Sequence, residues 1–486
     1  MAKKTRREMI ESLVALRQPE DRKLETFSEL FAPQMAAFEK SPRAKIMGGV
    51  SDEDKLALGE CLSNYMFESN NQANLGLDPL LALSVITSVF GNSVLPLFTS
   101  EQPLQDKQGV IYFENVIAKS ARGNVTAGQK LAAGASAKEV YPRGYASDKI
   151  YGIELGQGTG TEKTFALNFN ATNIRPNYVT IKAGNAIITD DGHGNLMGPQ
   201  VYGTVDYAAG TGSITFAVAP TAQTTIVGNV ATDFEADGNQ IPKINIEYDS
   251  KVVKAHTYLL QADTSILASF ISKKRLGIDA NKRAVEVLQQ QVLREITNDA
   301  IAKIGEAVNA DPLKLTQFNL ARSTGESVQA HINTYNLTHA KVQNKMSGVS
   351  GRGNFGAMLA GTEFCEFLTG LNEFKQEGTI TDDPSYFGTL GGRYGNIKVV
   401  RAPQMPSADK ASAYCVYQNS KVDAAAVFAP FMPVMVTNDI PVADNLTQRR
   451  SLIASMATTE VVVDKYLQKV SLTGTVNDMI PVPTAE

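Results

Sequence analysis

The chain has 486 residues, of which 43% are hydrophobic and 20% charged, and this composition indicates a folded protein of about two to four compact units. A formal net charge of −4 argues against a general nucleic-acid-binding protein, whose surface is strongly basic. Cys61, Cys365 and Cys415 lie far apart without a C-x-x-C motif, which excludes a disulfide framework or a cysteine-built zinc site. Because the charged start lacks an apolar run, we expect no signal peptide and a chain made and used in a cytoplasm.

Short amphipathic helices are predicted before residue 70, separated by prolines. Their apolar stripes are Met9, Ile10, Leu13, Val14 and Leu16, then Leu24, Phe27, Leu30 and Phe31. Ser51 opens a third helix in the manner of a capping box, with Asp54 in place of the usual Glu. Such helices bury little surface alone, so we expect them to pack on the body of the chain or on a partner chain.

Residues 79–100 carry no charge, which raises the question of a membrane span. A span needs about 20 mostly apolar residues, and basic residues usually flank it. Here Gly91, Asn92 and Pro96 interrupt the run and no basic cluster flanks it. The sequence therefore favours a buried helix followed by an extended arm.

Two distant segments, 109–118 and 243–254, have strand patterns and are expected to pair. Between them, Gly156–Asp233 is rich in Thr, Gly, Asn and Val, and it has its own turn rhythm, which predicts an inserted β-sandwich or barrel. Its predicted strands are Lys163–Phe169, Tyr178–Ala183, Ala186–Thr189, Gly203–Tyr207, Ser213–Val218 and Thr224–Asn229. Its predicted private core is Phe165, Leu167, Val179, Ile181, Ile214 and Phe216. Glycines at 156–158 and 238 suggest flexible junctions, and we expect a dispensable domain on an outer surface.

Two motifs in this segment suggest ligand sites but have simpler interpretations. Gly156, Gly158 and Gly160 resemble a phosphate-binding loop, but a strand pattern rather than a helix follows them. Residues 190–195, D-D-G-H-G-N, gather oxygen ligands for calcium but lack the distal Glu of a helix-loop-helix site. We therefore favour an ordinary tight turn there.

Residues 279–308 predict a long helix that organises the chain. One face is apolar at steps of three and four: Val285, Leu288, Val292, Ile296, Ala300 and Ile304. The opposite face is polar: Arg283, Glu286, Gln290, Arg294 and Asn298. Asp279 caps the start, and the expected length is roughly 43 Å. We interpret it as a spine against which sheets pack.

The remaining third predicts alternating helices and strands without an active site. A helix is expected at 326–344 and another at 363–370. A glycine-rich turn at 388–400 is expected to run into a strand, and further strands are expected at 413–418 and 424–430, followed by a polar loop at 438–457 and a last strand from 461. His193, His256, His331 and His339 have no Cys or carboxylate at ligand spacing, so none is expected to be a metal ligand or base. We expect an α+β protein with no catalytic, cofactor-binding or metal residue.

Five stretches occur in an order that resembles one known family. They are 96–113 (P-L-F-T-S-E-Q-P-L-Q-D-K-Q-G-V-I-Y-F), 263–304 with L-G-I-D-A at 276–280, 351–355 (G-R-G-N-F), 388–400 (G-T-L-G-G-R-Y-G-N-I-K-V-V), and 426–436 with 447–455. Together they resemble the major capsid protein of tailed bacteriophages, with the Hong Kong 97-type fold, especially its T-even-like branch. The inserted segment also resembles a small domain of phage structural proteins, through 175–184 and 203–216.

The resemblance implies a division of the chain into the parts of that fold. These are a helical N-terminal arm (1–78), an arm and outgoing strand of an extended loop (79–155), an inserted β-domain (156–235), the returning strand (236–262), a peripheral domain with the spine helix (263–344), an axial domain (345–440), and peripheral return strands with a C-terminal tail (441–486). The extended loop is expected to reach over a neighbouring subunit.

The implied function is that of a non-enzymatic head protein that needs no cofactor. It self-assembles into hexamers and pentamers of an icosahedral shell around double-stranded phage DNA, without sequence-specific binding or a membrane. Portal, scaffold and decoration proteins are the expected partners, and assembly in the host cytoplasm leads to the virion. Two alternatives remain: a tail-sheath or baseplate subunit with the same β-insert, and a cytoplasmic enzyme, which needs a polar pocket that the sequence does not show.

The resemblance also suggests a maturation site. T-even-like capsid proteins lose an N-terminal segment to a phage protease that cuts after Glu in an L-x-E setting. Leu58-Gly59-Glu60 matches this pattern, which predicts cleavage after Glu60. The alternative is that Glu60 is an ordinary solvated helix residue.

Overall fold

The computed structural model describes residues 20–71, 79–131, 145–235, 241–277, 279–321, 327–350, 354–375, 390–442 and 445–474. These residues form a mixed α+β fold in two compact units. The first unit contains residues up to 113, 249–346 and those from 353 onward, and the second contains 114–248 and 347–352.

The N-terminal helices pack within the first unit. They are α2 (Glu20–Leu30), α3 (Ala32–Glu39), α4 (Pro42–Met47), α5 (Asp52–Asn71) and α6 (Pro79–Asn92). Phe27 and Phe31 are buried, as the second apolar stripe predicted, whereas the first stripe lies outside the described residues. The capping box is confirmed, because Asp54 N donates to Ser51 Oγ (3.1 Å) and Ser51 N donates to Asp54 Oδ2 (3.2 Å). None of the described helices is long and apolar enough to cross a membrane.

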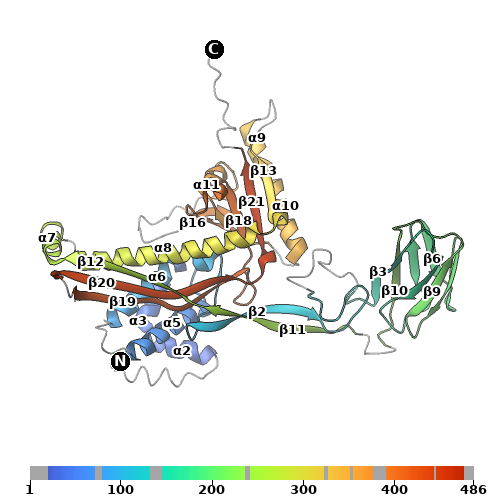
Figure 1. Ribbon diagram of the computed structural model, residues 1–486, viewed down its shortest axis with the longest axis horizontal. Coiled ribbons are helices and arrows are strands. Elements are labelled where there is room, and N and C mark those ends of the chain that lie inside the picture. Colours follow the sequence, from blue (N-terminus) through green and yellow to red (C-terminus); the bar gives the residue numbers. More distant parts are fainter. Residues whose placement is uncertain are drawn as a thin grey trace, which may run out of the picture. The chain divides into compact units, whose positions relative to one another are not determined.

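The first unit contains a four-stranded sheet in the order β1-β19-β20-β12. Figure 1 shows β19, β20 and β12 running side by side. Its strands are β1 (Ser100–Glu101), β19 (Ala426–Val442), β20 (Asn445–Val461) and β12 (His256–Ser265). Helices α5 and α6 contact β19, so the arm packs on the body of its own chain.

The expected polar loop at 438–457 is wrong, because these residues belong to a long β19–β20 hairpin. Pairing runs from Ala426↔Val461 to Val442↔Asn445, and β12 pairs with the other edge of β20 over ten residues without a register shift. The composition of β20 resembles that of a loop because several of its buried residues are small or polar, including Ser451, Ser455 and Ala457. The strand forms there because partners on both sides satisfy its backbone, and burial against a neighbour outweighs local propensity. The last strand is β21 (Leu467–Thr473), whereas β20 ends at Val461.

The predicted spine is helix α8 (Ala280–Asn309), which lies along this sheet and contacts β20, β12 and β19 (Figure 1). Asp279 Oδ1 accepts hydrogen bonds from the backbone of residues 281 and 282, as expected for a cap. All six residues of the predicted apolar face are buried. A second buried stripe, Leu293, Thr297, Ile301, Gly305 and Val308, was not predicted. Part of this stripe is covered by a second sheet, where a Cβ on Gly305 would lie 3.0 Å from Tyr414 Oη. Leu293 instead lines a small cavity with Val89 of α6 and Phe428 of β19.

That second sheet has the order β13-β21-β18-β14-β17-β16-β15. Besides β21, its strands are β13 (Leu315–Asn319), β18 (Ser412–Val416), β14 (Ala357–Ala360), β17 (Ile397–Arg401), β16 (Leu390–Tyr394) and β15 (Phe374–Lys375). Helix α11 is Thr362–Thr369, close to its predicted bounds. The single helix expected at 326–344 is two helices, α9 (Val328–Asn333) and α10 (Tyr335–Ser350), which are separated at Thr334.

The predicted strand pair is confirmed as a two-stranded ribbon of β2 (Gln108–Ala118) and β11 (Ile244–Lys254). In the second unit, an eight-stranded sheet has the order β3-β10-β5-β6-β7-β8-β9-β4. Its strands are β3 (Lys149–Gln157), β4 (Thr164–Asn168), β5 (Thr180–Ala183), β6 (Ala186–Asp190), β7 (Asn195–Gly198), β8 (Val201–Asp206), β9 (Thr211–Phe216) and β10 (Thr225–Ala231). The edge strands β3 and β4 contact each other, so the sheet is nearly closed.

Six of these eight strands were predicted, and β3 and β7 were not. The expected domain start at residue 156 falls inside β3, which pairs with β10 from Thr225↔Gln157 to Ala231↔Lys149. All six residues of the predicted private core belong to one buried cluster of this sheet. The residues at 190–195 form a turn between β6 and β7, and the glycines at 158 and 160 lie in a strand-to-strand connection.

Candidate assembly surfaces

The β2–β11 ribbon exposes apolar side chains to an unusual extent. On β11, Ile244, Ile246, Tyr248 and Val252 are 54–63% exposed, and on β2 Tyr112 is 51% exposed. The neighbouring polar residues of β11 are exposed as well, so the strand buries neither face over most of its length. Two paired strands alone are marginally stable in water. The ribbon is therefore an exposed and partly apolar surface.

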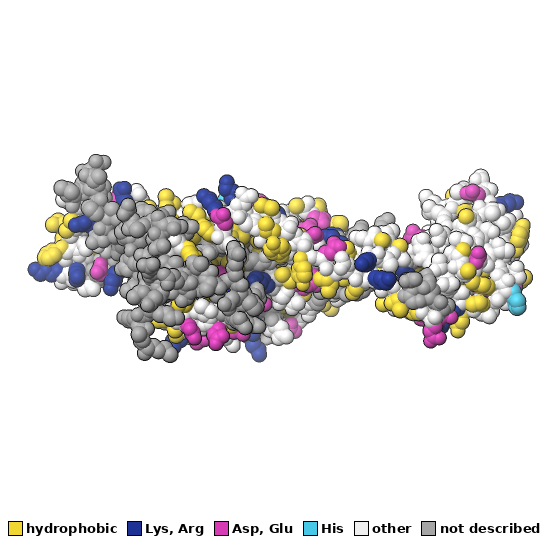
Figure 2. Space-filling view, turned by 90° about the horizontal axis from the view of Figure 1, so that it is seen from below, with side chains coloured by type: hydrophobic (Ala, Val, Ile, Leu, Met, Phe, Trp, Pro, Cys, Tyr) yellow, Lys and Arg dark blue, Asp and Glu magenta, His cyan; other side chains and the backbone are white. Residues whose placement is uncertain are grey.

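Helix α7 (Ile266–Leu276) is a second apolar surface, since none of its residues is buried. Leu267, Phe270 and Leu276 are 71%, 63% and 69% exposed, and three cations, Lys273, Lys274 and Arg275, occupy its last turn. A cavity of about 320 Å³ lies beside it, lined by Thr264, Ser265, Ile266, Ser269, Phe270, Lys273, Asn281 and Arg449. Figure 2 shows hydrophobic side chains that interrupt the polar surface on one face of the molecule. Exposed apolar clusters beside polar residues are typical of protein interfaces rather than of catalytic sites.

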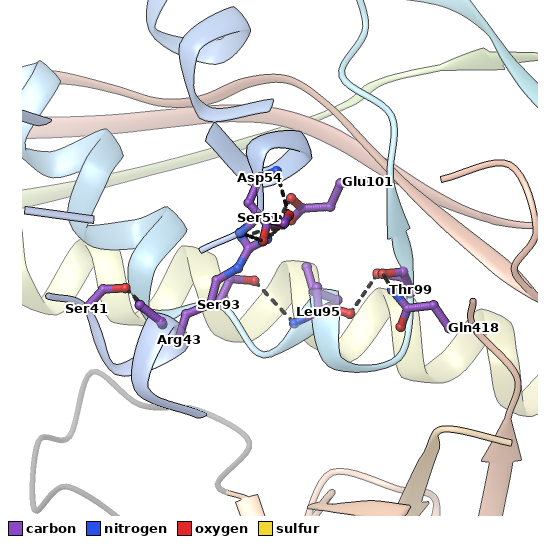
Figure 3. A network of polar contacts seen from close by, with 10 residues as sticks. Ser41, Arg43, Ser51, Asp54, Ser93, Leu95, Thr99, Glu101 and Gln418 are labelled. Carbon is purple, nitrogen blue, oxygen red and sulfur yellow. Dashed lines mark hydrogen bonds and ion pairs between the residues drawn. The ribbon is translucent and has the colours of Figure 1, made fainter. Parts of the chain in front are cut away.

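A buried ionic cluster fastens the N-terminal helices to β1 (Figure 3). Arg43 is 2% exposed; its Nη2 donates to Asp54 Oδ1 (2.6 Å) and to Glu101 Oε2 (2.9 Å), and its Nη1 donates to Glu101 Oε1 (3.2 Å). The guanidinium carbon lies 5.3 Å and 5.0 Å from the ring centroids of Phe38 and Phe90. The cluster therefore joins α3, α4, α5, α6 and β1.

The charges of this cluster depend on one another. Burial disfavours the charged guanidinium of Arg43, but Glu101 and Asp54 outweigh it and raise its pKa. Burial raises the pKa of Glu101, and Arg43 opposes that shift. Nearby, Thr99 Oγ1 donates to Leu95 O (2.8 Å) and Gln418 Nε2 donates to Thr99 O (2.9 Å), which fixes the chain that leads into β1 (Figure 3). Because Glu101 and Asp54 both accept hydrogen bonds from the Nη atoms of Arg43, the arrangement holds elements together.

Glu60, the residue before the expected cleavage point, lies within α5 and is half-buried. Its carboxylate is 3.6 Å from Lys23 Nζ, and its neighbours Gly59 and Cys61 are buried. A Cβ on Gly59 would lie 2.4 Å from the Phe27 ring, so α2 and α5 are in close contact there. Proteases bind extended backbone, and cleavage after Glu60 therefore requires this part of α5 to unwind.

The histidines and the acidic turn do not form a ligand site within the described residues. His339 packs among the rings of Tyr335, Phe355 and Tyr394, and burial lowers its pKa to about 4. In the 190–195 turn, Asp191 accepts backbone hydrogen bonds from residues 193 and 195, and hydrogen bonding from Asn195 lowers its pKa to about 2. Within the described ranges, no group of three or more His, Cys, Asp or Glu is placed to hold a metal ion.

Sequence reasoning missed both α7 and the Arg43 cluster. No helix is predicted at 266–276, although apolar residues on all sides of a short helix next to three cations are a detectable signal. The Arg43 cluster has no such signal, because Arg43 and Glu101 are 58 positions apart and each looks like a surface residue.

Several solved phage structures are similar to this chain at low sequence identity. The capsid of jumbo bacteriophage PhiKZ shares 10% identity, with 78% of this chain and 71% of that chain covered and a TM-score of 0.32. The mature capsid of bacteriophage PhiM1 shares 11% identity, with 47% and 75% covered and a TM-score of 0.31. The capsid of Myoviridae phage XM1 shares 9% identity, with 49% and 80% covered and a TM-score of 0.32. Similarity at this level does not by itself decide a fold.

Comparison with curated proteins gives no match. The family model described as "Major capsid protein Gp23" matches residues 81–478, which is most of the chain and includes the ribbon, α7, α8 and both sheets of the first unit. This match favours a capsid protein over the tail-sheath or baseplate subunit that the sequence left open. The chain belongs to the Gp23 family of phage major capsid proteins.

Proposed function

We propose that this capsid protein self-assembles into hexamers and pentamers of an icosahedral shell that encloses double-stranded phage DNA. The observation that carries the proposal is the β2–β11 ribbon, whose apolar residues are exposed on a chain of a capsid family. A ribbon of this kind gains stability by lying on another subunit. A shell subunit forms several modest contacts of this type, and a standard interface buries about 1,600 Å².

The proposed architecture is the Hong Kong 97-type capsid fold. In it the ribbon is the extended loop, 1–78 the N-terminal arm, 263–344 the peripheral domain with α8 as its spine, 345–440 the axial domain, and 441–486 the peripheral return and tail. We place the inserted domain at 148–235 rather than 156–235, because β3 belongs to its sheet. This correction also shortens the outgoing arm to 79–147.

We propose that assembly takes place in the host cytoplasm with portal, scaffold and decoration proteins as partners. The net charge of −4 is consistent with a container whose wall does not bind DNA tightly, because non-specific DNA binding relies on many cationic contacts. The proposal includes no catalytic role and no cofactor.

Cleavage after Glu60 stays a prediction, and the structure supplies its condition: α5 must unwind. Intact-mass spectrometry of mature particles measures it directly. A mass that begins at residue 61 supports cleavage, whereas a full-length mass rules it out.

Electron microscopy of the purified full-length chain tests the assembly proposal. We expect closed shells or capsomer rings, and dispersed particles or tubes would contradict it. In the same assay, Ile246→Asp should fold but fail to assemble, because it removes apolar contact area from an exposed side chain. Asn245→Asp is the matched control, since it adds the same charge at the adjacent exposed position and should still assemble.

A further inference from the structure

The junction between the ribbon and the inserted domain is built from three segments of the second unit. Residues 119–131 continue from β2, residues 145–148 lead into β3, and residues 232–235 follow β10. Of the glycines that suggested a flexible hinge, Gly156 lies inside β3 and is not part of this junction. Gly238 lies outside the described residues.

Arg122 lies at the centre of the junction and is 4% exposed. Its Nη2 donates to Ser147 O (2.7 Å), where the chain leads into the domain, and to Thr232 Oγ1 (2.7 Å), where the chain leaves it. Its guanidinium carbon is 4.8 Å from the centroid of the Phe234 ring. Thr232 also donates its backbone N–H to Asp148 O (2.8 Å). One side chain from the ribbon side therefore binds both ends of the inserted domain.

Two asparagines add hydrogen bonds between the loop and the inserted domain, Asn124 to β3 and Asn170 from the segment after β4. Asn124 Nδ2 donates to Gly152 O (2.6 Å) and Asn124 Oδ1 accepts from Glu154 N (3.0 Å), so its amide pairs with the strand as a neighbouring backbone would. Asn170, which follows β4, donates to Gly123 O (3.1 Å). Gly123 has a φ of +57°, and a Cβ there would lie 2.6 Å from Ile150 Cγ2. The loop backbone thus lies directly against the sheet.

The same loop is tied to the ribbon. Lys119 N donates to Lys243 O (2.8 Å), and Tyr145 Oη is within hydrogen-bond distance of Ser120 O (3.0 Å) and Lys243 O (2.9 Å). Ala118, Val125 and Tyr145 form a small buried cluster of their own. The junction therefore has a core and bonds on both sides, unlike a solvated linker.

We propose that this junction mounts the inserted domain rigidly on the end of the ribbon, with Arg122 as the positioning residue. The domain then moves together with the ribbon and presents its outer face in one orientation, instead of swinging on a tether. The planar guanidinium suits this role because it donates in several fixed directions at once, which a lysine ammonium does not reproduce.

A distance measurement between two spin labels on the full-length chain tests the proposal. Labels are attached at Asn245→Cys on β11 and Lys182→Cys on β5, both exposed, in a Cys365→Ser background because the other two native cysteines are buried. Dilution with unlabelled chain removes distances between molecules. We expect one narrow distance distribution in the otherwise native chain, and a broad one overturns the proposal whatever the variants do.

Arg122→Met and Arg122→Lys should broaden that distribution. Arg175→Ala is the matched control. Arg175 forms ion pairs at the same junction, 3.6 Å from Asp148 and 3.5 Å from Asp233, but its side chain is 39% exposed. Loss of such exposed ion pairs should leave the distance distribution narrow. A narrow distribution in Arg122→Met refutes the role of Arg122.

Asn124→Ala gives an independent result if the Arg122 variants do not fold, because it deletes two hydrogen bonds without touching a buried charge. We expect the Glu154 amide to exchange with deuterium on the order of tenfold faster in this variant, together with a broadened label distribution. Unchanged exchange and an unchanged distribution count against the rigid junction.

Discussion

Replacing Arg43 by methionine should be among the most damaging single changes in the first unit. The substitution keeps much of the apolar stem between Phe38 and Phe90 but leaves Glu101, whose side chain is 7% exposed, without its cation. Removing one partner of a buried ion pair typically costs about 3–5 kcal/mol, because the remaining charge stays desolvated. We therefore expect the free energy of unfolding of this unit to fall by that amount.

Urea unfolding of the unassembled chain measures this loss, followed by circular dichroism because the chain has no tryptophan. The matched control is Arg283→Ala, whose partner Glu286 is 2.9 Å away but 56% exposed; the expected loss is about 0.5 kcal/mol or less. Combining Arg43→Met with Glu101→Gln should recover part of the stability, since no isolated charge remains.

The pH dependence of the Arg43→Met variant provides the refuting result. Without Arg43, burial is left to raise the pKa of Glu101, so the folded state binds a proton that the unfolded state releases. The variant then becomes more stable as the pH falls. Its loss of unfolding free energy relative to the unchanged chain should therefore be smaller at about pH 5 than at about pH 8. An equal loss at both values would show that the damage does not come from a buried carboxylate.

Three further predictions concern the spine, helix α10 and the inserted domain. Ile296→Asp should abolish soluble folded protein because it buries an unpaired charge, whereas exposed Arg294→Ala should fold; equal melting of both would show that the helix face is misassigned. Burial lowers the pKa of His339 from 6.5 to about 4, so the side chain is neutral in the folded state. Above about pH 6.5 its titration does not reduce the free energy of unfolding, which then falls by up to about 3 kcal/mol as the pH is lowered toward 4, because the unfolded state binds the proton first. His339→Phe should flatten the dependence of melting temperature on pH in that window, and an unchanged slope would exclude this residue as its source. The fragment 119–235 should melt cooperatively, whereas the fragment 156–235, which cuts β3, should not; the reverse order would refute the revised boundary.

Local periodicity determined several parts of this protein before any tertiary contact was known. The apolar repeat from Val285 to Ile304 specifies a helix with one buried face, because only a 3.6-residue period brings those side chains together. Alternation inside the insert likewise identified the private core, including Phe165 and Ile214, since a strand of period two places alternate residues on one face. The order of five short motifs along the chain was enough to suggest the capsid family. The match to the family model then showed that the chain belongs to it.

Other features depend on residues that are distant in sequence, so no local pattern contains them. Ser451, Ser455 and Ala457 form a strand rather than a loop because β12 and β19 pair with it on both sides. Arg43 is buried because Glu101, 58 residues away, supplies its countercharge. The second buried stripe of α8 and the contacts of Arg122 arise in the same way. Burial and hydrogen bonding between distant segments outweigh local propensity at these places, and only the folded chain brings those segments together.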